Sequence, residues 1–343
     1  QVNAYTSNGL TCFHGRVVDT RLGELAEVLG DITQNSKLDD ADVESERLVI
    51  GEEIDMYEDS PENLVSEKLL SAVYDGSALG RSILGTRESL NGLSGEKLRG
   101  YMKSRYVGGA TVVALAGSYS DADFAKISDI FSRLPAGEAE KFDTTLYKPG
   151  VTAVNKDIEQ VHLALAFPGV DSYDARRFAL GMLSDILGGG MSSRLFQEVR
   201  EKRGLCYSIY SQSSSFADTG IFTVNTATNA ESQAEMLRVI TEEIRRILDF
   251  GVTEDELRRE RELVEASVLM SLESSSARMS RVGNNEMTYG RVPTPDEIIA
   301  RYEAVTAEDI AALAAELFRP ELMSASVVGK GAEDANALDI PIW

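Results

Sequence analysis

Stretches in which apolar and polar residues alternate predict the β-strands of this chain. Residues 161–167 carry Val, Leu, Leu and Phe at every second position, and residues 220–227 alternate in the same way. A period of two is typical of a strand with one buried face. Residues 110–117 are instead a nearly continuous run of small apolar residues, which predicts a third strand.

Between these strands, apolar residues recur at the spacing of helices. Residues 121–134 follow this period after Asp121. Ser60-Pro61 and Thr294-Pro295 mark two further helix starts, because Ser or Thr caps the free amides of the first turn and Pro suits the first helical position. The mixture predicts an α+β fold in which helices cover each sheet.

The sequence also contains an internal repeat. Residues 93–98 correspond to residues 305–310, which lie 212 positions later, and both segments read as a capped helix start. Residues 42–47 resemble residues 256–261 at the similar offset of 214. We therefore expect two homologous domains, each a mainly antiparallel sheet covered by helices. They are predicted as an N-terminal domain at residues 1–140, a linker at 141–156 and a C-terminal domain at 157–343.

The repeat further predicts that the first domain is truncated at its N-terminus. The strand at residues 161–167 and a helix predicted at residues 172–187 would have their counterparts upstream of Gln1. The chain also opens at Gln rather than Met. We therefore expect the N-terminal domain to lack its first strand and its first helix.

Composition narrows the range of partners. The chain has 343 residues, 56 Asp and Glu against 34 Lys and Arg, and a net charge of −22. This charge argues against nucleic acid or an anionic bilayer as the main partner. No run of about 18 apolar residues is present, so we expect no membrane span. The only two cysteines are too few for a disulfide framework and fit a reducing compartment, which predicts a bacterial cytoplasm.

Most short catalytic motifs are absent. The sequence contains no H-E-x-x-H, no G-x-S-x-G, no P-loop and no C-x-x-C. The only histidines, His14 and His162, both fall in strand patterns. A single strand histidine is more often a packed or surface residue than a ligand, and we favour that interpretation for both.

Two acidic residues on one predicted helix form the first candidate pair. Glu46 and Glu53 are seven residues apart, or about two helical turns, and lie at the edge of an apolar stripe. Half-buried carboxylates at such an edge suit a metal ligand or an acid/base group. The alternative is that they face solvent with the other acids of this helix, and spacing alone favours that alternative.

Arg200 and Tyr207 form the second pair. Residues 193–203 predict a helix that ends at Gly204, and residues 205–212 predict a strand. Both side chains should therefore lie near one corner, where Arg can bind a carbonyl or carboxylate and the Tyr hydroxyl can donate to a peptide carbonyl. A helix-end cation and an ordinary strand aromatic are the alternative, again favoured on spacing alone.

Three segments of the sequence together favour the functional interpretation of both pairs. Residues 46–54 resemble the distal metal-ligand helix of the pitrilysin/insulinase-type zinc peptidases, in the branch of the mitochondrial processing peptidase and its bacterial homologues. Residues 3–13 resemble that family's strand beside the active site. Residues 187–208 resemble the signature of its second domain. The family is itself built from a duplicated domain, so the resemblance agrees with the repeat.

The resemblance implies a role for each candidate. Glu53 matches the third zinc ligand, and Glu46 matches the supporting acid near the metal. Arg200 and Tyr207 match the pair that holds the substrate backbone. The strand Asn3, Ala4, Tyr5 and Thr6 matches the edge onto which a substrate peptide is added as a further strand.

One departure from the family is large. Its first two zinc ligands and its general base lie on an H-x-x-E-H helix, which is absent from these 343 residues. We expect this helix upstream of Gln1, so that the chain as given binds no Zn²⁺ and is inactive.

Two functions remain open. The first is a zinc-dependent metalloendopeptidase that cleaves peptides or unfolded segments in an enclosed chamber, with cationic peptides favoured by the acidic charge. The second is a non-catalytic partner or structural subunit of the same fold. A homodimer or a heterodimer with a homologous subunit is expected in either case.

Overall fold

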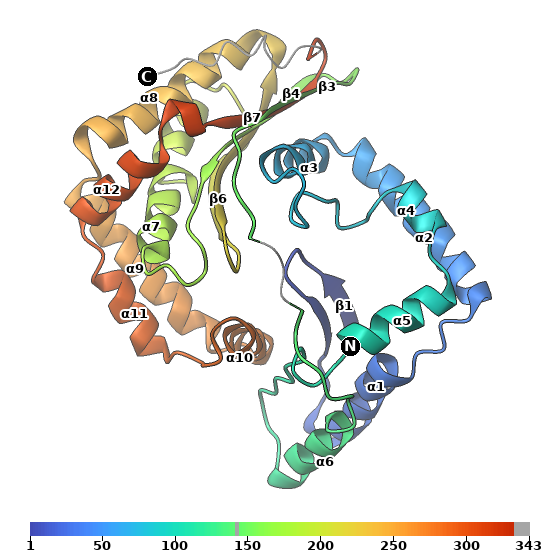
Figure 1. Cartoon of the computed structure of the whole chain (residues 1–343). Coiled ribbons are helices and arrows are strands. Elements are labelled where there is room, and N and C mark those ends of the chain that lie inside the picture. Colours follow the sequence, from blue (N-terminus) through green and yellow to red (C-terminus); the bar gives the residue numbers. More distant parts are fainter. Residues whose placement is uncertain (141–143, 333–343) are drawn as a thin grey trace. The chain divides into compact units, whose positions relative to one another are not determined.

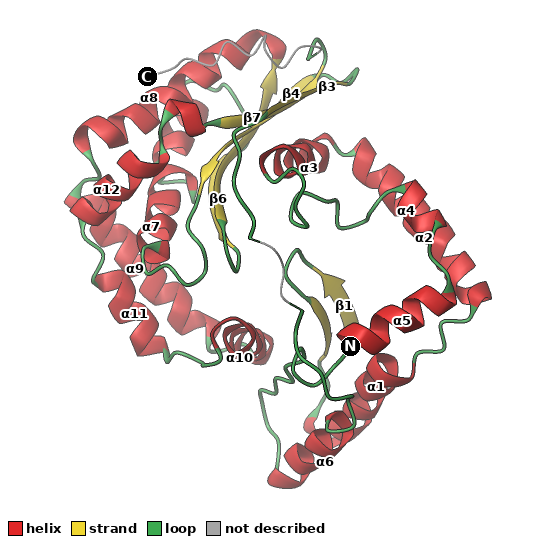
Figure 2. Cartoon of the chain, viewed as in Figure 1, coloured by secondary structure: helices red, strands yellow, loops and turns green. Residues whose placement is uncertain are grey.

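The computed structural model describes residues 1–140 and 144–332, and its secondary structure is drawn in Figures 1 and 2. Residues 141–143 of the predicted linker and residues 333–343 of the predicted second domain lie outside the described residues. The described chain divides into two compact units. Unit 1 consists of residues 1–55, 83–140 and 268–293, and unit 2 consists of residues 56–82, 144–267 and 294–332.

Each unit draws on both halves of the sequence. Residues 56–82 belong to unit 2, and residues 268–293 belong to unit 1. These two segments begin 212 positions apart, which is the offset of the sequence repeat. Helices α2 (Asp40–Asp59) and α9 (Glu254–Ser271) each begin in one unit and end in the other. The predicted boundary between residues 140 and 157 concerns the sequence halves and stays a prediction.

A five-stranded sheet forms the centre of unit 2. Its order is β3 (Val151–Asn155), β7 (Ser324–Gly329), β4 (Gln160–Pro168), β6 (Gly220–Asn229) and β5 (Ile209–Ser215). β3 runs parallel to β7, and the other neighbours are antiparallel. The strands predicted at residues 161–167 and 220–227 are present as β4 and β6. Three of the four neighbouring pairs are antiparallel and one is parallel, so this sheet is mixed but mainly antiparallel, and the fold is α+β as predicted.

Both faces of this sheet are covered, which differs from the half-buried strand expected at residues 161–167. The Val, Leu, Leu and Phe of β4 face a large core beneath α7 (Arg177–Gly188), α8 (Gln233–Phe250) and α12 (Ala307–Leu317). The intervening Ala164 and Ala166 face α3 (Pro61–Val73), which lies against the sheet in Figure 1. Two alanines leave room for a helix to pack closely on this face. Leu64 and Leu69 of α3 fill the space together with Tyr74, the residue that follows the helix.

The helices of unit 2 begin where the sequence signals predicted. Ser60 caps α3, and Thr294 caps α11 (Pro295–Glu303) in a capping box with Glu297. Thr306 caps α12 (Ala307–Leu317), as Ser94 does for α5 in unit 1. α7 (Arg177–Gly188) begins later than the predicted residue 172, and α8 spans Gln233–Phe250. Within the described residues, no helix combines the length and apolar character needed to cross a bilayer.

Unit 1 contains a two-stranded antiparallel ribbon and several helices. The ribbon is β1 (Val2–Thr6) paired with β2 (Thr11–Gly15). α1 (Leu22–Asn35) packs against α6 (Asp121–Phe131), where Gly30 lies so close to Ile130 that a Cβ would clash. The other helices are α2 up to Asp55, α4 (Arg87–Asn91), α5 (Gly95–Arg105) and α10 (Ser275–Tyr289).

The strand predicted at residues 110–117 is not formed, and this prediction was wrong. These residues are irregular in the structure, although Ala114 packs near Gly283 of α10. Residues 326–329, their counterparts in the repeat, belong to β7 and pair with both β3 and β4. Among the described residues of unit 1, only β1 and β2 are strands, so the apolar run has no ladder to join.

Candidate functional site

Arg200 and Tyr207 lie together in unit 2. The guanidinium carbon of Arg200 is 5.0 Å from the centre of the Tyr207 ring and 4.5 Å from the centre of the Phe196 ring. The Arg200 cation therefore contacts two aromatic rings, a favourable electrostatic arrangement. Tyr207 is 82% exposed, so its hydroxyl is open to a ligand.

The backbone beneath this pair differs from the predicted α-helix. Residues Phe196–Glu201 form a π-helix, a rare conformation that is frequent at functional sites. The turn ends at Gly204, whose φ of +61° favours glycine and whose N–H donates to the Arg200 carbonyl at 2.9 Å. β5 begins at Ile209 rather than at the predicted residue 205. Arg200 and Tyr207 therefore flank an irregular connection.

A half-buried ion pair anchors the segment that leads into this π-helix. Arg194 donates two hydrogen bonds to Glu256, at 2.7 and 2.8 Å, and a third to the Gly251 carbonyl at 3.0 Å. Burial alone would raise the pKa of Glu256, but the bonds from Arg194 and Thr253 outweigh it and lower the pKa to about 2. Glu256 therefore stays ionised and fixes the start of the π-helix to α9. No spacing pattern along the chain indicates this long-range pair.

Cys206 stands between Arg200 and Tyr207 in the chain. Burial raises the pKa of the Cys206 thiol, and the Thr226 hydrogen bond and the Arg200 charge oppose this shift only in part. The thiol is therefore a poor nucleophile at neutral pH. The chemistry available at this corner is hydrogen bonding by Arg200 and Tyr207.

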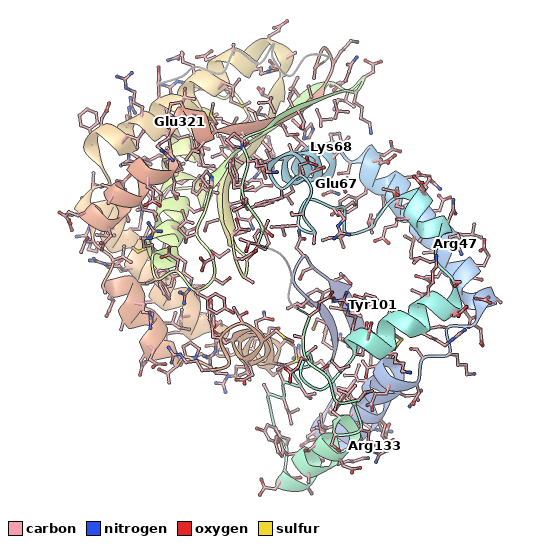
Figure 3. All side chains as sticks on the ribbon, in the orientation of Figure 1. Arg47, Glu67, Lys68, Tyr101, Arg133 and Glu321 are labelled. Carbon is pink, nitrogen blue, oxygen red and sulfur yellow. The ribbon has the colours of Figure 1, made fainter. Side chains whose placement is uncertain are left out.

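Glu46 and Glu53 are both exposed, as the solvent-facing alternative favoured by spacing alone predicted, and neither is the half-buried carboxylate that would suit a metal ligand. The contacts of α2 are made by neighbouring positions. Arg47, labelled in Figure 3, donates to the carbonyls of Leu90 and Leu93, while Ile54 is buried. One residue along a helix turns by about 100°, which carries Glu46 and Glu53 away from the packed face.

A hollow of about 480 Å³ lies between α2 and α4 in unit 1. Arg47, Glu52 and Arg87 line it, but Glu46 and Glu53 do not. Arg87 pairs with Asp55 and donates to the Gly51 carbonyl at 3.1 Å. The hollow is therefore framed by basic residues already engaged with the protein, and it is distinct from the predicted acidic pair.

The described residues do not fit a zinc centre. No group of three or more His, Cys, Asp and Glu side chains that could hold a metal is found among residues 1–140 and 144–332. A catalytic zinc needs about three protein ligands and a water. Glu53 alone cannot provide such a set.

The predicted peptide-binding strand is present as β1. Asn3, Ala4, Tyr5 and Thr6 are all exposed, and β1 pairs with β2 along one edge. No strand in the described part of the chain pairs with its other edge. A free edge of this kind offers main-chain donors and acceptors to an added strand.

The candidate residues thus form separate groups. Asn3 to Thr6, Glu46 and Glu53 belong to unit 1, and Arg200 and Tyr207 belong to unit 2. His162 lies on β4, where burial lowers its pKa and the Glu62 carboxylate opposes the shift.

Comparison with protein families gives two matches. Residues 1–87 match the model described as insulinase (peptidase family M16), and residues 92–264 match the model described as the peptidase M16 inactive domain. Together the two models span most of the chain.

Sequence relatives agree with these matches. The chain is 37% identical over 332 residues to the uncharacterized zinc protease YmxG of Bacillus subtilis, covering 96% of this chain and 81% of the relative. It is 36% identical over 343 residues to an uncharacterized zinc protease of Streptomyces coelicolor, covering 96% and 74%.

Solved structures share the fold. A peptidase M16 inactive domain from Pseudomonas fluorescens has a TM-score of 0.87 at 22% identity, covering 96% of this chain and 80% of that one. A chain of the Candida albicans complex III₂ has a TM-score of 0.83 at 17% identity, covering 96% and 81%. The family resemblance inferred from the three sequence segments is confirmed. The chain belongs to the insulinase family of peptidases, family M16.

Proposed function

We propose that this chain forms most of a zinc-dependent metalloendopeptidase that cleaves peptides or unfolded segments in an enclosed chamber. The observation that carries the proposal is that Arg200, on the π-helix, contacts the rings of Phe196 on the same helix and of Tyr207 beyond its end. Relatives more than 30% identical are named zinc proteases, which supports the reaction class.

Arg200 and Tyr207 would bind the substrate backbone. The aromatic contacts fix the guanidinium plane, and its N–H groups would donate to peptide carbonyls. The exposed Tyr207 hydroxyl would donate to a further carbonyl. Such contacts do not read side chains, which suits a peptidase that accepts many sequences.

The edge of β1 would add to this backbone recognition. A substrate laid along Asn3 to Thr6 would exchange N–H···O=C bonds with the strand. The net charge of −22 supports a preference for cationic peptides, because it attracts them over about a Debye length.

Metal binding requires residues beyond these 343. Glu53 is our candidate for one zinc ligand and Glu46 for its supporting acid, while the remaining ligands and the general base would lie on an H-x-x-E-H helix upstream of Gln1. Unit 1 has only two strands in its described part against five in unit 2, which supports a truncated first domain. We infer that the chain as given is inactive.

Further parts of the proposal concern organisation. Two observations support two homologous domains. The helices α5 and α12 have matching N-caps, and residues 56–82 of unit 2 begin 212 positions before residues 268–293 of unit 1. We infer a homodimer or a heterodimer with a homologous subunit, no nucleic-acid partner, and a bacterial cytoplasmic location. Bacterial relatives support the last inference.

A non-catalytic subunit of the same fold is the second candidate. It is favoured by the exposed, single Glu53 and by the fold shared with a chain of complex III₂. The retained Arg200 and Tyr207 favour the enzyme, because a structural subunit needs no substrate-binding pair.

The sequence upstream of Gln1 separates the two candidates. An H-x-x-E-H helix there supports the enzyme, and replacement of either histidine supports the structural subunit. If the motif is present, the full-length protein should contain one zinc per chain and cleave a fluorogenic peptide.

Glu53→Gln in that protein should abolish zinc binding and cleavage. Glu52→Gln, which changes the neighbouring exposed acid, should leave both unchanged. Full zinc content in the Glu53→Gln variant would refute the assignment of Glu53.

A further inference from the structure

The strand β2 of unit 1 has an open edge. In an antiparallel ladder, pairs that exchange two hydrogen bonds alternate with pairs that exchange none. Gln1 and Arg16 form a bonded pair, with N–H to carbonyl distances of 2.8 and 3.0 Å. Counting by two along the register, Cys12 and His14 bond to β1, so the N–H and carbonyl of Phe13 point the other way. No described strand pairs with β2 on that side.

Unit 2 shows what binds at the corresponding edge. Its hairpin β5–β6 leads into α8 and α9, as β1–β2 leads into α1 and α2, so β6 is the counterpart of β2. β6 pairs with β5 on one edge and with β4 on the other. β4 also pairs with β7, whose counterpart in the repeat is residues 112–117. The single strand β4 therefore joins two elements whose counterparts in unit 1 share no ladder.

Ring contacts show the same relation in both units. In unit 1, the Phe13 ring of β2 and the Tyr106 ring have their centres 6.2 Å apart. Phe318 lies 212 positions after Tyr106, and its ring is 5.0 Å from the ring of Phe222 on β6. The Phe318 ring is also 4.9 Å from the ring of Phe167 on β4. Tyr106 thus keeps the neighbour from the hairpin, and the neighbour from the β4 counterpart is the missing one.

The helix α1 has an uncovered surface beside this edge strand. It packs on α6 through the side that carries Gly30 and Gln34, and the Gln34 amide donates to the Ile130 carbonyl at 3.2 Å. Val28 and Ile32 lie one turn apart on the opposite side and are 46% and 38% exposed. In unit 2, the counterpart α8 buries six apolar residues and contacts the π-helix that precedes β5. The element that corresponds to this cover in unit 1 would precede β1.

We propose that a segment preceding Gln1 docks as an antiparallel β-strand between β2 and residues 112–117, and that helical residues after it cover Val28 and Ile32. The docked strand gives residues 112–117 the ladder that they lack. One face of the strand carries alternating apolar side chains, as β4 does, with one of them against Tyr106. The inference rests on the upstream segment of the proposed function, but it requires no metal ligand in that segment.

The occupant of both surfaces belongs to the same protein. In unit 2, the elements at the corresponding places lie within Gln160–Glu201 and run directly into β5. The sequence repeat therefore assigns their counterparts to the chain that continues into β1. The match to the Bacillus subtilis relative covers 96% of this chain but 81% of that protein, so the relative is longer.

Hydrogen–deuterium exchange of the 343-residue chain and of the full-length protein tests the docked strand. The amide of Phe13 and alternate amides of residues 112–117 should exchange at least about tenfold more slowly in the full-length protein, because each gains a hydrogen-bond acceptor. The amide of His14 is the internal reference, since it bonds to β1 in both forms. Equal exchange of the Phe13 amide in the two forms overturns the inference.

A pair of substitutions tests the cover on α1. Val28→Glu should lower the midpoint of thermal unfolding of the full-length protein by at least about 2 °C and leave that of the 343-residue chain nearly unchanged, because only the full-length protein buries this position. Leu48→Glu is the matched control and should change neither midpoint. Leu48 is 67% exposed, and its counterpart 214 positions later is the exposed Glu262. An equal loss from Val28→Glu in both forms shows that nothing covers α1.

The outcomes separate this inference from its alternatives. If the 343-residue chain already protects the Phe13 amide and is a dimer by light scattering, a second copy occupies the edge and the inference is wrong. If the full-length protein protects the amide but binds no zinc, the strand docks and only the proposed peptidase function fails. Zinc binding without protection refutes the docked strand and leaves the peptidase function standing.

Discussion

Glu260 offers a direct test of the electrostatics of unit 2. It lies on α9, is 6% exposed, and has a pKa raised to about 7. Burial is the largest cause, the Asp185 carboxylate adds to it, and the Arg259 cation opposes it. The folded protein therefore holds a proton on Glu260 that the unfolded chain has already released at neutral pH.

The size of the effect follows from the shift. A pKa that rises from 4.5 to about 7 on folding corresponds to about 3 kcal/mol of lost stability once the group is ionised in both states. Because the folded-state pKa is the higher one, the loss begins above the unfolded pKa and is complete above the folded pKa. Glu260→Gln removes the charge and should remove this loss.

Chemical denaturation at two pH values measures the difference. Glu260→Gln should raise the free energy of unfolding by about 1 kcal/mol at pH 5.5 and by about 3 kcal/mol at pH 8.5. The matched control is Glu256→Gln, one turn earlier on α9. It leaves the half-buried Arg194 without its charged partner and should cost about 3 kcal/mol, which corresponds to a pKa lowered from 4.5 to about 2.

The control should vary much less between the two pH values, because the Glu256 charge is only the smallest of the causes that raise the pKa of Glu260. The pKa of Glu256 is about 2 in the folded protein and 4.5 in the unfolded chain. The stability that Glu256 contributes is therefore lost only as the pH falls from about 4.5 towards 2, below both test values. A stabilisation by Glu260→Gln that is equal at pH 5.5 and 8.5, or a destabilisation at both, would show that Glu260 is not a buried titrating group.

Three further substitutions test other parts of the structure. Arg200→Ala in the full-length protein should lower kcat/KM for a peptide by at least about tenfold, because a charged hydrogen bond is worth about 1.5–3 kcal/mol. Arg203→Ala is the control and should leave kcat/KM nearly unchanged. If Arg200→Ala and Arg203→Ala lowered peptide cleavage equally, the assignment of Arg200 to substrate binding would be wrong. Gly204→Ala should destabilise by about 1 kcal/mol in urea denaturation, since its φ is +61°, and an unchanged midpoint would contradict that conformation. Tyr74→Phe should lower the midpoint of thermal unfolding. The buried Tyr74 hydroxyl donates to the Gly220 carbonyl at 2.9 Å, and loss of this hydrogen bond costs about 1–3 kcal/mol. An unchanged midpoint would mean that the hydrogen bond contributes nothing to stability.

Local signals in the sequence predicted the elements whose structure depends on near neighbours. The caps at Ser60, Ser94, Thr294 and Thr306 were confirmed, because a capping side chain binds amides within three residues. The alternation at residues 161–167 predicted β4 for the same reason. That β4 is covered on both faces depends on α3, which lies far away in the sequence.

The predictions that failed depended on partners at long range. Residues 110–117 have a strand-like composition, but a strand needs a ladder, and none is formed with them in the described structure. The half-buried position considered for Glu46 and Glu53 rested on an apolar stripe, whereas Arg47 and Ile54 set the packed face of α2. The solvent-facing alternative that spacing favoured is the one observed. The π-helix at residues 196–201 has no sequence period that separates it from an α-helix. The Arg200–Tyr207 pair was predicted to meet because only a short turn separates the two residues.

Residues 56–82, from the first half of the sequence, belong to unit 2, and residues 268–293, from the second half, belong to unit 1. This arrangement has a consequence for protein production. A fragment that starts at Thr144 would contain the five strands of unit 2 but not α3. Its sheet would then expose Ala164, Ala166, Ile221 and Val328 to water. Such a fragment should aggregate when expressed alone, and adding the segment that contains α3 in trans should restore its solubility.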